Sequence, residues 1–187
     1  PLDMLEAGQR LGLTFVSVAH ESSAAIMAAY YGRMKNTAGL ALAVKGVGAA
    51  NLAGGATNAY FERSPVVCIC ESSPANVTQA ELVQHCDHTG LFGAIVKQKD
   101  TLTADTAANI VQQAVFAATD GRPGPVLLNF PSDLAQAESG MPLPVRPVVQ
   151  NDIPDQAHLA TLRERLKRAC RPVIIAGADV IRAGATD

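Results

Sequence analysis

Val16-Ser-Val-Ala-His-Glu21 joins a predicted strand to a predicted helix, and the other elements of the chain are interpreted around it. Residues 15–18 are typical of a short buried strand, and residues 22–34 of a helix that follows at once. The helix is apolar on almost every side, which predicts that it is buried. Glu21 is therefore a carboxylate at the point where the chain enters the core.

Two interpretations of Glu21 follow from the residues themselves. An acid in the first turn of a helix complements the helix dipole and stabilises it by about 0.3–1 kcal/mol. A buried carboxylate has a raised pKa, which suits proton transfer near neutral pH and predicts a catalytic acid or base. The stretch alone leaves both interpretations open, so the rest of the chain has to decide.

Strands and helices alternate along most of the sequence. Strands are expected at residues 13–18, 40–44, 66–70, 94–97 and 126–129, and helices at residues 1–12, 22–34, 49–63 and 101–119. A short helix is also expected near residues 80–83. Continuously apolar strands fit a parallel sheet that is covered on both faces. The alternation predicts an α/β fold, a three-layer α/β/α arrangement around a mainly parallel sheet.

The character of the chain changes after residue 131, where prolines accumulate and no period is visible. Such a segment is typical of an extended linker. We therefore expect a first domain at residues 1–133, a linker at 134–154 and the opening part of a second domain at 155–187. That part should contain a helix at 156–169 and a strand at 172–176.

Composition restricts the classes of function. The 187 residues are 48% hydrophobic and 17% charged, with a net charge of −2, which argues against disorder and against nucleic acid as the main partner. No apolar run reaches the length of a membrane span and no signal pattern is present, so we expect a cytoplasmic protein. Cys68 and Cys70 lie two apart on one strand, which predicts buried, reduced and inert thiols.

Polar residues and glycines gather where strands are expected to end, and ligands of parallel α/β sheets bind at the carboxyl ends of strands. Three features lie there: Glu21, the turn Gly46-Val-Gly48 with Asn51 behind it, and the loop at residues 84–88. The turn resembles a dinucleotide-binding motif only weakly, because Asn51 replaces its third glycine. His85, Asp87 and His88 could ligate a metal ion, but no further cluster supports a metal site.

Several longer motifs occur in a fixed order. They are VAHESSAAIMAAYYGR (18–33), GVGAAN (46–51), NAYFERSPVV (58–67), QHCD (84–87) followed by Gly90 and Lys97, and DGRPGPVLLNFPSD (120–133). Together they resemble the N-terminal, pyrimidine-binding domain of thiamine diphosphate-dependent enzymes. The group concerned contains acetolactate synthase, pyruvate oxidase and benzoylformate decarboxylase, and the resemblance covers nearly the whole chain.

The resemblance implies roles for individual residues. Glu21 matches the acid that hydrogen-bonds the ring nitrogen of the cofactor's aminopyrimidine and, by sharing a proton there, activates the cofactor. Val47 matches a residue whose backbone meets the aminopyrimidine, and Asn51 matches a position near it. Gln84 matches a polar side chain that faces cofactor and substrate, and His85 beside it is a further candidate for substrate contact.

The resemblance also implies what lies outside these residues. The cofactor is thiamine diphosphate, and its diphosphate and Mg²⁺ are held by a domain with a Gly-Asp-Gly…Asn segment, which this sequence does not contain. The active site lies between two subunits of a homodimer or homotetramer, and the substrate is a 2-oxo acid or aldehyde. Relatives begin with one more strand, inside the sheet, so we expect the first strand of the family domain to be missing. Lys45 departs from the small hydroxyl residue of many relatives.

The main hypothesis is the pyrimidine half of the active site of a 2-oxo acid decarboxylase or carboligase of acetolactate synthase type, inactive as this chain alone. Two alternatives remain: a non-catalytic dimerising module and a flavodoxin-like nucleotide binder.

Overall fold

The computed structural model describes the chain except for residues 1, 75–76, 78–82, 139–153 and 186–187. The chain divides into two compact units, Pro1–Pro147 and Val148–Asp187, which are described separately. The short helix predicted near residues 80–83 and most of the predicted linker lie outside the described residues.

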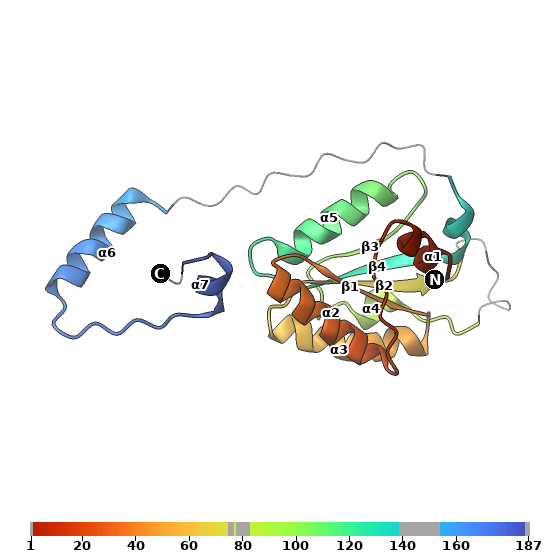
Figure 1. Ribbon diagram of the computed structural model, residues 1–187, viewed down its shortest axis with the longest axis horizontal. Coiled ribbons are helices and arrows are strands. Elements are labelled where there is room, and N and C mark those ends of the chain that lie inside the picture. The colour runs from red at the N-terminus through yellow and green to blue at the C-terminus, as the bar shows by residue number, and fades with distance from the viewer. Residues whose placement is uncertain (1, 75–76, 78–82, 139–153, 186–187) are drawn as a thin grey trace. The chain divides into compact units, whose positions relative to one another are not determined.

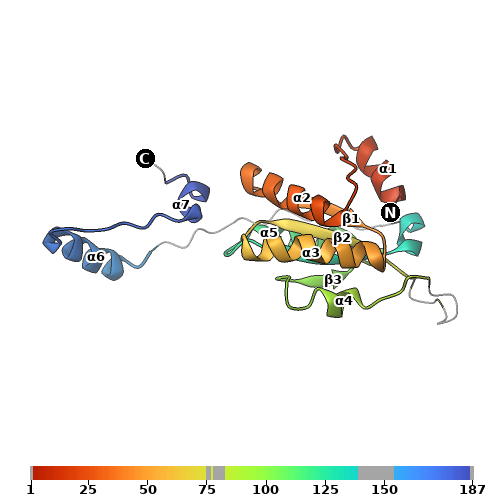
Figure 2. The same ribbon diagram turned by 90° about the horizontal axis from the view of Figure 1, so that it is seen from below.

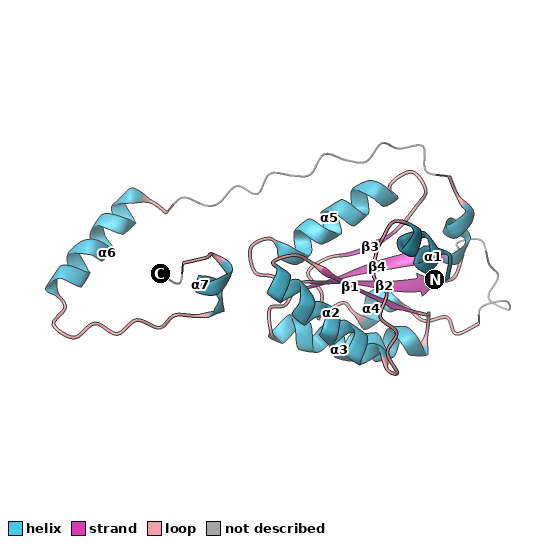
Figure 3. Ribbon diagram, in the orientation of Figure 1, coloured by secondary structure: helices cyan, strands magenta, loops and turns pink. Residues whose placement is uncertain are grey.

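The first unit is built on a four-stranded sheet in the order β1-β2-β4-β3, in which every neighbouring pair is parallel. The strands are β1 (Gly39–Ala43), β2 (Val66–Ser72), β3 (Lys99–Thr101) and β4 (Pro125–Pro131). The register places Cys68 of β2 between Ala41 of β1 and Leu127 of β4. The predicted mainly parallel sheet is therefore confirmed (Figure 3).

Helices cover both faces of this sheet (Figures 1 and 2). One face carries α2 (Glu21–Lys35), α3 (Val47–Phe61) and α4 (His88–Leu91), and the other carries α1 (Leu2–Arg10), α5 (Ala107–Thr119) and the short 3-10 helix η2 (Ser132–Gln136). Alternation along β2 separates two cores, because Cys68 and Cys70 pack toward α2 and α3 while Val67 and Ile69 pack toward α5. The three-layer α/β/α prediction is confirmed.

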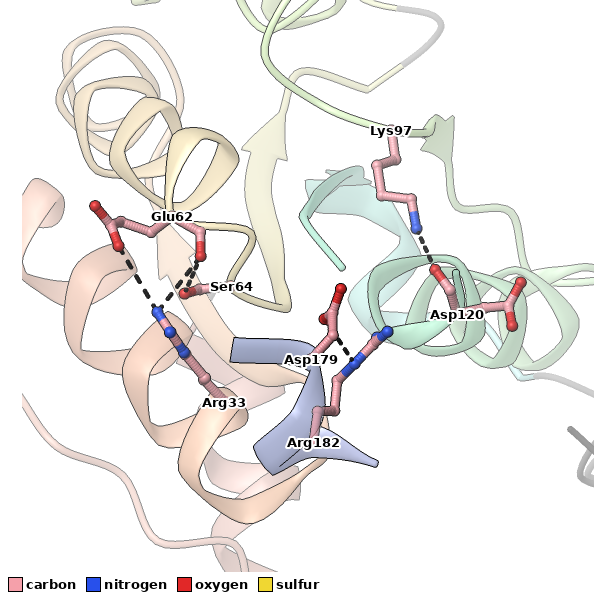
Figure 4. A network of polar contacts seen from close by, with 7 residues as sticks. All are labelled: Arg33, Glu62, Ser64, Lys97, Asp120, Asp179 and Arg182. Atoms are coloured by element: carbon pink, nitrogen blue, oxygen red, sulfur yellow. Dashed lines mark hydrogen bonds and ion pairs between the residues drawn. The ribbon is translucent and has the colours of Figure 1, made fainter. Parts of the chain in front are cut away.

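Small residues let α2 and α3 approach each other closely. A Cβ atom on Gly55 of α3 would lie 2.4 Å from the backbone oxygen of Ser22 and 2.7 Å from the Cβ of Ala25, both on α2. At the far ends of the two helices, Arg33 lies 3.7 Å from the Glu62 carboxylate and donates to the Glu62 carbonyl at 3.5 Å (Figure 4). The helix pair is therefore fixed at both ends.

A lysine closes the end of α5. Lys97 donates a hydrogen bond to the carbonyl of Asp120 at 2.8 Å (Figure 4). It donates another to the carbonyl of Ala117. A cation at a helix C-terminus satisfies carbonyl groups that have no partner within the helix, and it interacts favourably with the helix dipole.

The prediction that α2 is buried on all sides is wrong. Its buried residues are the small ones, Ala25, Ala29 and Gly32, whereas Tyr31 is 59% exposed and Met34 82% exposed. The small residues recur at helical spacing and form one narrow stripe against the core, so the larger apolar side chains face outward in the described chain.

Three predicted strands differ from the structure. Residues 13–18 form no strand, and Phe15 and Val16 are exposed, because no described strand lies beside them to pair with their backbone groups. The strand predicted at 94–97 lies at Lys99–Thr101 instead, after a turn. In the second unit, residues 172–176 form no strand.

The second unit contains α6 (Gln156–Arg168) and α7 (Ala178–Arg182). Asp155 caps α6, because its carboxylate accepts a hydrogen bond from the Ala157 amide at 3.0 Å. The predicted helix at 156–169 is confirmed, while the domain boundaries stay a prediction. None of the described helices has the length and apolar character needed to cross a membrane.

Candidate cofactor site

Glu21 and Asn51 meet where α2 and α3 begin. Asn51 donates a side-chain hydrogen bond from Nδ2 to Glu21 Oε2 at 3.0 Å. The Ser22 hydroxyl donates in turn to the backbone carbonyl of Asn51. His20, the N-cap of α2, accepts the Ser22 amide at Nδ1 at 3.1 Å. Two residues that the sequence predicted for one site are thus in direct contact.

The Glu21 carboxyl is held in its ionised form. The hydrogen bond from Asn51 is the main cause that holds the pKa of Glu21 below its ordinary value, and the hydrogen bond from the Glu21 backbone amide is the second. Partial burial acts in the opposite direction and raises this pKa, but by less. The nearby His20 lowers the pKa further. Burial alone would raise this pKa, as the interpretation of Glu21 as a buried carboxylate expects, but Glu21 is only half-buried and its hydrogen bonds, which favour the charged form, outweigh that effect.

A glycine keeps the second carboxylate oxygen of Glu21 clear. A Cβ atom on Gly48, in the first turn of α3, would lie 3.3 Å from Glu21 Oε1 and 2.8 Å from Cγ2 of Val44. Asn51 therefore engages one oxygen, while the other faces a position without a side chain.

A hollow of about 530 Å³ opens beside the same first turn of α3. Gly46, Val47 and Ala50 form one wall, and the segment containing Gln84 and His85 forms the other. Cys86, Asp87 and Leu91 complete the lining. The structure thus brings together the other three predicted site residues, Val47, Gln84 and His85. The first turn of α3 is shared between this hollow and the Glu21–Asn51 pair.

The two walls touch through unusual backbone conformations. Gly46 has a φ of 68° and Gln84 a φ of 54°, both in the left-handed region. A Cβ on Gly46 would lie 2.5 Å from the Gln84 carbonyl oxygen, so only glycine fits there. A non-glycine residue at positive φ costs roughly 1–3 kcal/mol and is concentrated at ligand-binding positions.

The sequence reasoning missed a buried polar network behind the hollow. His88, the first residue of α4, is only 4% exposed. Its Nδ1 lies 3.0 Å from Asn129 Oδ1, and its Nε2 accepts the Gly46 amide at 3.4 Å. The sequence signal for this network was Asn129, a polar residue that directly follows the apolar residues 126–128 of a strand. Among the described residues, no group of three or more His, Cys, Asp or Glu side chains is arranged to hold a metal ion.

The two cysteines of β2, Cys68 and Cys70, are buried and free, as predicted. Burial raises the pKa of both thiols, that of Cys70 to about 12. The neighbouring Cys86, which lines the hollow, adds to the shift of Cys70. Thiols of this kind are neutral near pH 7 and poor nucleophiles.

Comparison with known proteins shows which family the chain resembles. Residues 1–91 match the family described as the thiamine pyrophosphate enzyme, N-terminal TPP binding domain. The chain is 31% identical over 183 residues to a probable acetolactate synthase large subunit of Methanocaldococcus jannaschii, covering 94% of this chain and 31% of the relative. It is 31% identical over 171 residues to the acetolactate synthase isozyme 2 large subunit of Escherichia coli, covering 90% and 31%.

A catabolic acetolactate synthase of Raoultella terrigena is similar at 32% identity over 168 residues, covering 88% of this chain and 30% of the relative. The chain therefore spans about a third of the length of these relatives.

Proposed function

Since the chain carries the N-terminal TPP binding domain of the thiamine pyrophosphate enzyme family, we propose that its hollow and the adjoining Glu21 bind the aminopyrimidine of thiamine diphosphate. We further propose that the complete protein is a 2-oxo acid decarboxylase or carboligase of acetolactate synthase type. The similarity to relatives named acetolactate synthases extends over almost all of this chain, which supports that class of reaction.

The observation that carries the proposal is the meeting of Glu21, Asn51 and the hollow at the first turn of α3. An aminopyrimidine is a flat ring with hydrogen-bonding groups at its edge, so it needs an apolar wall and a polar group directed at one ring nitrogen. Val47, Ala50 and Leu91 supply apolar lining, and the Glu21 carboxylate beside the hollow supplies the polar group. The residues present therefore fit the group.

Each residue has a separate task in this proposal. Glu21 holds and shares a proton at the ring nitrogen, and Asn51 orients the carboxylate and keeps it ionised before the ligand arrives. Val47 contacts the ring through its backbone and side chain. Gln84 and His85 also line the hollow, and in this proposal they contact the substrate. Bound thiamine diphosphate supplies a carbon nucleophile and an electron sink that side chains lack.

Binding of the diphosphate and of Mg²⁺ is assigned to residues outside this chain. We propose that a diphosphate-binding domain of a second subunit holds the diphosphate and Mg²⁺, and that the substrate is a 2-oxo acid or aldehyde. The Gly-Asp-Gly segment expected for that domain is not among these 187 residues. We therefore expect this chain alone, supplied with thiamine diphosphate and Mg²⁺, to show no turnover of pyruvate or benzoylformate.

The decisive experiment replaces the proton-sharing group. In the complete enzyme, Glu21→Gln keeps the side-chain shape and can still accept from Asn51, but it cannot share a proton with the ring. We expect exchange of the C2 proton of bound cofactor, followed by NMR, to slow by about 10²-fold or more. Glu62→Gln, at the opposite end of α3, is the matched control and should leave the rate unchanged.

An unchanged exchange rate in Glu21→Gln would refute the role of this carboxylate. Tight binding of a flavin or adenine nucleotide, with no binding of thiamine diphosphate, would instead support the nucleotide-binder hypothesis.

A further inference from the structure

The His88 network admits only one arrangement of protons. The Gly46 amide is a donor, so the Nε2 atom that it contacts must carry a lone pair. Nδ1 then carries the ring proton and donates it to Asn129 Oδ1 at 3.0 Å. Asn129 uses its Nδ2 to donate to the hydroxyls of Thr89 and Thr101, each at 3.4 Å. His88 is thus a neutral imidazole in the Nδ1–H form, with both ring nitrogens engaged.

This ring connects the sheet to both walls of the hollow. Asn129 lies on β4 and pairs in register with Cys70 of β2, so it belongs to the centre of the sheet. Gly46 is the N-cap of α3 and directly precedes Val47. His88 itself follows the segment that contains Gln84, and Asp87 fixes the start of α4 by accepting the Gly90 amide at 3.0 Å. The imidazole therefore sets the spacing between the two walls.

We propose that His88 is a positioning residue for cofactor binding, a role that rests on the function proposed above. It does not line the hollow, so it acts through Gly46, the residue of positive φ that directly precedes Val47 in the lining. His88 supplies the acceptor for the Gly46 amide and so holds that turn, because a partly buried amide that loses its partner costs stability.

The first test needs no cofactor and no variant. In the 187-residue chain, ¹⁵N NMR of the imidazole should show the Nδ1–H form for His88 near neutral pH. The Gly46 amide proton should exchange with solvent more slowly than the amides of exposed turns. An Nε2–H form for His88, or a Gly46 amide that exchanges like an exposed one, would overturn the proposal.

The second test separates positioning from general support of the fold. His88→Gln keeps a carbonyl acceptor for Gly46 and an amide donor for Asn129, whereas His88→Leu keeps only volume. In the complete enzyme we expect His88→Leu to weaken thiamine diphosphate binding about 10-fold, measured by calorimetry, because the turn loses its acceptor. His88→Gln should stay within about 3-fold of the wild type.

The outcomes are distinct. Equal losses in both variants would show that the ring matters only for packing and would overturn the positioning role. A wild-type enzyme that does not bind thiamine diphosphate would refute the proposed function and, with it, this role. If His88→Leu does not fold, the comparison of His88→Gln with the wild type and the NMR measurements still decide the proposal.

Discussion

Gly55 of α3 lies close against α2, and replacing it with alanine tests how tightly the two helices pack. The new Cβ would lie 2.4 Å from the Ser22 backbone oxygen and 2.7 Å from the Ala25 Cβ. Ordinary contacts of such atoms begin near 3.4 Å, so α2 must move by roughly 1 Å. Because the nearest atom belongs to the backbone, a side-chain rotation cannot relieve the overlap.

The expected energy is a balance of two effects. Overpacking of a well-packed core costs about 1–3 kcal/mol. Replacing a glycine by alanine within a helix stabilises it by about 0.5–1 kcal/mol. We expect Gly55→Ala to lower the free energy of unfolding by about 1–2 kcal/mol, and the shift of α2 to separate Glu21 from Asn51.

The three tyrosines of the chain make the measurement specific. Tyr30 and Tyr31 lie on α2 and Tyr60 on α3, and the sequence contains no tryptophan, so tyrosine fluorescence during urea unfolding reports on this helix pair. Gly54→Ala is the matched control: its Cβ would meet only the Ser22 hydroxyl at 3.1 Å, and its net effect should be near zero. A Gly55→Ala chain that is as stable as this control would refute the packing argument.

Three further predictions follow from other parts of the structure. Asn51→Ala should raise the pKa of Glu21 toward its ordinary value, as measured by ¹³C NMR of the carboxyl, and an unchanged titration midpoint would contradict the Asn51 contact. Because the pKa of Glu21 is lowered in the folded protein, the ionised carboxylate contributes stability at neutral pH. That stability is lost as the pH falls through the folded pKa. A thiol reagent at pH 7 should label the exposed Cys170 quickly and the buried Cys68 only on unfolding, as followed by peptide mass spectrometry; fast labelling of Cys68 would show that β2 is accessible. The outward-facing apolar side chains of α2 should make the chain self-associate at micromolar concentration in light scattering, and Met34→Glu should shift it toward monomer, whereas a stable wild-type monomer would show that the exposed apolar residues need no partner.

The apolar runs of the sequence predicted β2 and β4, the two strands that have a neighbouring strand on both sides. Residues 66–70 and 126–128 are continuously apolar because β2 and β4 are covered on both faces, and both strands form where expected. Residues 13–18 show the same kind of pattern but form no strand. The local pattern of apolar residues predicts whether a segment prefers the strand conformation. A strand also needs a neighbouring strand for its backbone hydrogen bonds, and the sequence of the segment does not show whether one is present.

The site was predicted in part for a similar reason. Motif order led to Glu21 and Asn51, and the structure joins them by a hydrogen bond. His88 and Asn129 were missed as a pair because they are 41 residues apart and meet only through the packing of α4 on β4. The direction of the Glu21 pKa shift was also out of reach, since it depends on which donors surround the carboxylate.

The two sides of the site are carried by backbone of different kinds. Glu21 and Asn51 stand at the starts of two packed helices, whereas Gln84 and His85 belong to an exposed connecting segment. Substitutions on the connecting segment disturb few core contacts, while changes at the helix starts disturb the close packing of α2 against α3. If the proposed function holds, divergence among descendants of such a protein, or a directed-evolution library, can alter positions 84 and 85 and so change the substrate, while positions 21 and 51 are inherited unchanged.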